Sequence, residues 1–130
     1  MGDQIGNAIR YDSKSMNPIG LNLVVLRSSQ PKELAVWYGK LLNRTVNEEK
    51  HSHGPLHHSL QLGDSVIEFY PQKHKAQSAP MTFGLVVSTH TFERLSATTT
   101  SKILNENSVI INDLDNNQII VQRRISSKDS

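Results

Sequence analysis

The first part of the chain shows a strand pattern followed by a helix pattern. The run Leu21–Leu26 is apolar apart from Asn22 and predicts a buried strand. Pro31 suits the first turn of the helix that follows, and Asn43 suits a left-handed stop at its end. Between them, apolar residues recur at offsets of three, four, seven and eight positions, which predicts an amphipathic helix; they are Leu34, Trp37, Tyr38, Leu41 and Leu42.

A predicted hairpin follows the helix and gathers polar side chains on one face. Residues 44–50 are expected to form a short strand, and 51–58 a turn rich in histidine. The hairpin strands are 59–62 and 65–70, joined by the turn Gly63-Asp64. Period-two alternation then puts six residues on one face: His57, Ser59, Gln61, Val66, Glu68 and Tyr70. Such a polar face is unusual inside a small domain, so we take it as the candidate lining of a cavity.

The second half repeats this order after a polar linker at 72–80 that is bracketed by prolines. Each half has a Leu-Val-Val run, a helix and a closing hairpin, which predicts two βαβββ units, the second one shorter. The alternative is that the two halves resemble each other by chance, because strand–helix patterns are common. The elements expected in the second unit are a strand, a short helix, a strand, a turn and a last strand, at Phe83–Ser88, Thr91–Ala97, Ser108–Asn112, Asp113–Asn117 and Gln118–Gln122.

Composition narrows the class of protein. The 130 residues suffice for one domain, and 14 scattered basic residues against 12 acidic ones give no basic stripe for nucleic acid. The absence of cysteine excludes disulfides, thiolate zinc sites and a cysteine nucleophile. Residues 1–17 are polar and no apolar run is long enough to span a bilayer, so we expect a cytoplasmic protein with no membrane or nucleic-acid partner.

At the level of motifs, the chain resembles a known superfamily. The strand 21–26, the helix with Trp37-Tyr38, and the hairpin ending Val66–Pro71 resemble the first module of the glyoxalase/bleomycin-resistance/dioxygenase superfamily, also called vicinal oxygen chelate proteins. The strand 83–88 and the turn 113–117 are similar to parts of its second module, and the histidine-rich segment is similar to one in small uncharacterised members.

The resemblance implies a fold class and domain limits. The expected fold is α+β, with two βαβββ modules that form a curled mixed sheet around a cavity. A single glyoxalase-like domain at 19–124 is expected, with modules at 19–71 and 81–124 on either side of the linker. Residues 1–18 would be an N-terminal arm and 125–130 a C-terminal tail.

The resemblance also implies where metal ligands would lie, on the first and last strands of each module. The first position falls on Asn22, or on Leu23 if the register slips by one, and the last strand of the first module supplies Glu68. The second module offers only positions near Phe83 and at Ile120, with Gln122 the next residue facing the same way. Because only Glu68 is a strong ligand, the usual metal site is expected to be degenerate.

Six residues are the candidates for ligand binding: Asn22, His57, Ser59, Glu68, Tyr70 and Gln122. Imidazole and carboxylate are ligands for divalent transition metals, so Glu68 and His57 are also candidate metal ligands, with His53 or Asn22 as a third. The alternatives are a solvent-facing loop with incidental histidines and a register that turns Ile67 inward in place of Glu68.

These observations favour a small-molecule-binding protein with a degenerate metal site and no required cofactor. By resemblance, it would act as a homodimer. The alternative is a divalent-metal-dependent lyase, isomerase or dioxygenase acting on a vicinal-oxygen substrate. An interaction module whose cavity has closed is the third hypothesis, since one fold hosts many functions.

Overall fold

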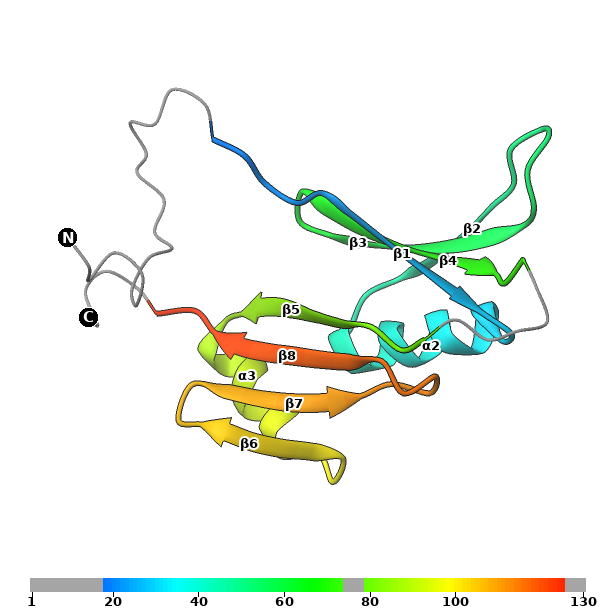
Figure 1. Ribbon diagram of the computed structural model, residues 1–130. Helices are drawn as coiled ribbons and strands as arrows, with labels where there is room; N and C mark the ends of the chain where they lie inside the picture. Colours follow the sequence, from blue (N-terminus) through cyan, green and yellow to red (C-terminus); the bar gives the residue numbers. More distant parts are fainter. Residues whose placement is uncertain (1–17, 74–78, 126–130) are drawn as a thin grey trace.

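The first module is a four-stranded mixed sheet with one helix against one of its faces (Figure 1). The computed structural model describes residues 18–73 and 79–125, so most of the expected arm and tail, and the middle of the expected linker, lie outside the described residues. The strand order is β1-β4-β3-β2, with β1 parallel to β4 and the other pairs antiparallel. The elements are β1 (Leu23–Ser28), α2 (Pro31–Leu42), β2 (Val46–Glu49), β3 (His57–Leu62) and β4 (Ser65–Pro71).

The second module has the same topology, which confirms the predicted pair of βαβββ units. Its strand order is β5-β8-β7-β6, again with one parallel pair, between β5 and β8. Its helix has 8 residues against 12 in α2, and its strands include β6, which the sequence pattern did not predict. The elements are β5 (Thr82–Val87), α3 (Thr89–Ser96), β6 (Ser101–Asn105), β7 (Ser108–Asn112) and β8 (Gln118–Arg123).

The two sheets remain separate. Among the described residues, no strand of one sheet pairs with a strand of the other, so the chain does not close them into one continuous sheet. β1 and β5 each lie at the edge of their own sheet, and each has one neighbouring strand in the part of the chain that the structure describes. Neither described helix is long and apolar enough to cross a membrane.

Helix α2 determines which face of the first sheet is buried. It begins at Pro31 and ends before Asn43, whose φ of 56° is the left-handed stop predicted from the sequence. The helix lies close to β2, since a Cβ at Gly39 would come within 2.8 Å of Cγ2 of Val46. Its buried residues meet alternate residues of the sheet in one core; the cluster includes Leu34, Ala35, Tyr38, Leu42, Leu26, Leu60, Ile67 and Phe69.

The same helix connects the two modules through one buried hydrogen bond. The hydroxyl of Tyr38 donates to Oδ2 of Asp113, in the turn between β7 and β8, at 2.6 Å. The Asp113 carboxylate also accepts hydrogen bonds from the backbone and side chain of Asn117. Burial, together with the bond to Asp113, raises the pKa of Tyr38 well above its usual value.

Replacing Tyr38 with phenylalanine should therefore lower stability and change its alkaline pH dependence. Losing the hydrogen bond should lower the free energy of unfolding by about 1–2 kcal/mol at pH 7. Because the pKa of Tyr38 is raised in the folded state, its contribution is complete below the ordinary tyrosine pKa of 10.0 and declines as the pH rises above it. Urea unfolding at pH 7 and at pH 10.5 should show a smaller alkaline loss in Tyr38→Phe. Equal stability at pH 7 and equal alkaline loss would contradict this account.

Candidate functional site

The face of the first sheet that points away from α2 carries the predicted polar residues. Leu62 pairs with Ser65 across the hairpin, as expected for a two-residue turn, and Ser59 pairs with Glu68. Val25 of β1 also lies opposite Glu68, so the face extends across the strands. α2 packs against the alternate residues, and the predicted set of His57, Ser59, Gln61, Val66, Glu68 and Tyr70 is therefore confirmed to share one face.

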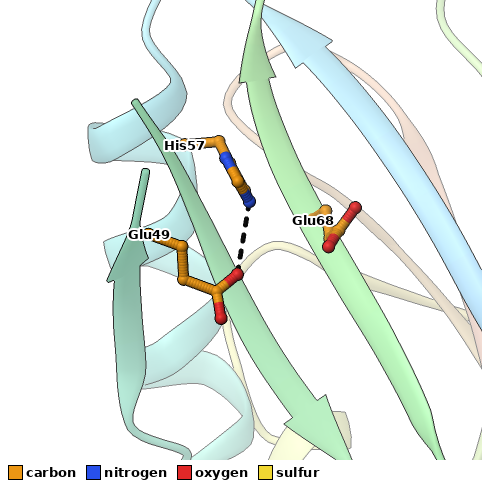
Figure 2. Close-up of side chains that lie close together, drawn as sticks. All are labelled: Glu49, His57 and Glu68. Carbon is orange, nitrogen blue, oxygen red and sulfur yellow. Dashed lines mark ion pairs between the residues drawn. The ribbon is translucent and has the colours of Figure 1, made fainter. Parts of the chain in front are cut away.

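Three side chains from three neighbouring strands converge on this face. Figure 2 shows His57 of β3 between Glu49 of β2 and Glu68 of β4. One ligand atom from each of the three side chains lies within 4.8 Å of the other two. His57 is fully buried, whereas the two carboxylates are partly exposed. The arrangement offers one imidazole nitrogen and two carboxylates to whatever binds there.

The contacts of His57 define which of its nitrogens faces the carboxylates. Nδ1 lies 3.2 Å from the carbonyl oxygen of Pro55. Because a carbonyl oxygen can only accept, this bond requires the proton on Nδ1 and leaves a lone pair on Nε2 of the neutral ring. Nε2 lies 3.2 Å from Oε1 of Glu49 but has no hydrogen-bond partner among the described residues.

A stack of planar groups holds the imidazole in place. The ring of Tyr70 lies parallel to that of His57, with centroids 4.3 Å apart and an interplanar angle of 7°. The guanidinium of Arg27 lies 5.3 Å from the centroid of Tyr70, and the ring of His51 lies 5.3 Å from that of His57. The ring of Tyr70 therefore packs within the site, and His57 is held by contacts to its face as well as by Pro55.

Two candidate ligand-binding residues lie apart from this cluster. Asn22 precedes β1 and is exposed, so the expectation that it is buried in the first strand is wrong. Strand alternation places Leu23, not Asn22, on the face of Glu68. Gln122 is exposed on β8 of the other sheet, and the exposed His53 is not part of the cluster.

Glu49 is the residue of the cluster that sequence reasoning missed. β2 and β3 are antiparallel, with Glu49 opposite His57 and Glu48 opposite His58. The two adjacent Glu-Glu and His-His pairs are symmetric about position 53, within the histidine-rich turn. An antiparallel pairing of the two segments about position 53 would have placed Glu49 opposite His57.

A separate cavity of about 570 Å³ lies between the two sheets. Residues of β1, β4 and β5, most of them apolar, form more than half of its lining, and Arg44 and Arg124 add positive charge. None of the six predicted ligand-binding residues lines this cavity. The polar cluster and the cavity are therefore different features of the chain.

Comparison with known proteins identifies the fold. No family model matches the chain, and no curated protein sequence matches it significantly. Among solved structures, the oxidase ChaP-H2 matches with a TM-score of 0.65 at 13% identity, over 84% of this chain and 96% of its own. Lactoylglutathione lyase from Agrobacterium tumefaciens matches with a TM-score of 0.55 at 13% identity, over 82% and 94%. An integron cassette protein from V. cholerae matches with a TM-score of 0.59 at 17% identity, over 85% and 99%.

The chain has the glyoxalase-like fold. The resemblance drawn from the sequence motifs is confirmed in this sense, and identities this low establish architecture rather than activity.

The metal-ligand positions expected from the sequence resemblance are not brought together in one cluster. Phe83 packs against the core, and its ring stacks on that of Tyr38 with centroids 6.3 Å apart. Ile120 carries no donor, and Asn22 lies outside β1. Of the implied positions, only Glu68 offers a strong ligand on the polar face, and its neighbours there are Glu49 and His57 of the same module.

Proposed function

We propose that this glyoxalase-like protein binds a small molecule on the polar face of its first module. The observation that carries the proposal is the convergence of Glu49, His57 and Glu68 beside a partly exposed apolar strip on β1. Leu23 and Val25 of that strip are 45% and 37% exposed. The two carboxylates favour a ligand whose polar end carries positive charge or hydrogen-bond donors, and the apolar strip favours an apolar body next to it.

The ligand-binding unit is proposed to be a homodimer. Among the described residues, β1 and β5 are edge strands with a single neighbour each, as are β2 and β6, and unpaired edges are templates for pairing with another chain. β1 and β5 both present exposed apolar side chains, since Val86 of β5 is 54% exposed. Pairing β1 of one copy with β5 of the other would join the two sheets edge to edge. The polar face of the first module would then continue onto the face of the partner's second module that points away from α3. Gln122 lies on that face of the second module, which would return it to the site.

The second candidate is the metal-dependent lyase, isomerase or dioxygenase. The observation that favours it is the same cluster of one imidazole and two carboxylates, because those groups bind divalent metals. A metal there would act as a Lewis acid on substrate oxygens. Glu68 and His57 would be its ligands, together with Glu49.

Calorimetric titration with small aromatic and aliphatic amines, in the presence of EDTA, tests ligand binding. We expect at least one amine to bind, and Glu68→Gln to weaken that binding by about tenfold or more because a charge-assisted hydrogen bond is lost. Glu48→Gln is the matched control, since Glu48 lies on the same strand as Glu49 but on the opposite face. Absence of binding across the panel, or equal weakening by the control, would contradict the proposal.

Sedimentation equilibrium tests the dimer. We expect a mass of twice the 14.6 kDa chain, and a shift toward the monomer in Val86→Lys, because a lysine at this edge opposes strand pairing. Ile103→Lys is the control, since Ile103 is 80% exposed on β6, at the far edge of the same sheet. A wild-type monomer, or dissociation by both substitutions alike, would rule out pairing through β5.

A further inference from the structure

We propose that the first module binds a first-row divalent metal ion by itself, through Glu49, His57 and Glu68. The inference deepens the second candidate function, on whose cluster it rests, because the ion would take the place that the first candidate gives to the positively charged end of a ligand. It differs from the pattern implied by the fold, in which both modules supply ligands. Here β2, β3 and β4 of a single sheet supply all three.

The three donors are close enough to reach one ion after small side-chain rotations. Oxygen and nitrogen ligands lie about 2.0–2.2 Å from zinc, which places neighbouring donors roughly 3 to 3.5 Å apart. The present separations are all within 4.8 Å. The side chain of Glu49 is 43% exposed and attached to a flexible stem, so it can move toward His57 without disturbing the core.

The two carboxylates and the lone pair on Nε2 of His57 together favour a bound cation. Nε2 of His57 and both carboxylates are acceptors when the imidazole is neutral, and Nε2 is buried without a hydrogen-bond partner among the described residues. A buried acceptor with no partner is costly, so either a proton or a metal ion should occupy the space between these groups. The bond from Nδ1 to Pro55 fixes the ring orientation, as backbone carbonyls commonly do for metal-binding histidines.

The opposite face of the sheet provides an internal comparison. His58 is also buried and lies 3.4 Å from Glu48, on the same two strands that carry His57 and Glu49. Its neighbour on β4 is Phe69, whereas β4 places Glu68 beside His57. The face toward α2 therefore offers an imidazole with one carboxylate, and the polar face offers an imidazole with two. Both ring nitrogens of His58 also lack a hydrogen-bond partner among the described residues, so the third donor is what separates the two faces.

The ligand set indicates the class of metal. One imidazole with two carboxylates suits Zn²⁺, Mn²⁺ or Fe²⁺, whereas Mg²⁺ prefers oxygen ligands alone in strict octahedral geometry. Three donors from one sheet face leave the remaining coordination positions directed away from the sheet. Those positions would accept water or an oxygen of a bound molecule.

Titration of the untagged, EDTA-treated full chain with Zn²⁺ alone tests the proposal. We expect one Zn²⁺ per chain in calorimetry, and long-range ¹H–¹⁵N spectra should show a shift of Nε2 of His57. Glu49→Gln and Glu68→Gln should each weaken binding at least tenfold, and Glu48→Gln should change it by less than twofold. Thermal unfolding of each apoprotein checks that the isosteric amides keep the fold.

A variant of the histidine-rich turn distinguishes this site from metal binding by that turn. The chain with His53→Gln should keep the Zn²⁺ site, because His53 is exposed and lies outside the cluster, whereas His51 is left in place because its ring lies near that of His57. Loss of binding in that variant would assign the metal to the turn and overturn the proposal. So would a folded wild-type chain that binds neither Zn²⁺ nor Mn²⁺, or a shift of His57 that survives in Glu68→Gln. The amine titration in EDTA reports on the proposed function independently of all these outcomes.

Discussion

One helix covers one face of the first sheet, and most of the organisation of the module follows from that constraint. Residues of β3 and β4 alternate between the two faces, so those that meet α2 are Leu60, Ile67 and Phe69. The residues between them are left on a face that no helix of the described residues covers. Polar groups that would be costly inside a packed core, such as Glu68, can stay there within reach of solvent. Because α2 covers one face of the sheet, the opposite face is left free for the site.

The link between Tyr38 and Asp113 extends this organisation to the second module. The same helix that packs on the first sheet contacts the turn before β8 and the ring of Phe83. The aspartate also orders its own turn by accepting hydrogen bonds from Asn117. Two sheets that share no strand pairing among the described residues are therefore connected through a helix, a turn and an aromatic contact.

Local patterns were enough to predict the helices, the hairpin and the polar face. α2 was predictable because its apolar stripe is regular, and the hairpin because Gly63 accepts the φ of 60° that its turn requires. β6 was missed because Ile103 and Leu104 are adjacent and both exposed, so the strand lacks alternation. Glu49 was missed because its partner lies beyond the turn 50–56, and pairing across a turn of that length depends on tertiary contacts. The start of β1 was misplaced for a related reason, since strand ends depend on the neighbouring strand.

The parallel pairing of β1 with β4 also has a consequence for how the chain folds. Leu23 lies opposite Val66, so β1 cannot pair with β4 until the residues between them have been synthesised. Closing a long loop before gaining its contacts is entropically unfavourable and slows folding. In the second module, Thr82 pairs with Gln118 over a shorter stretch, which favours earlier closure. During synthesis, β1 therefore stays unpaired over a longer stretch of chain than β5, and its exposed apolar residues need protection from aggregation over that time.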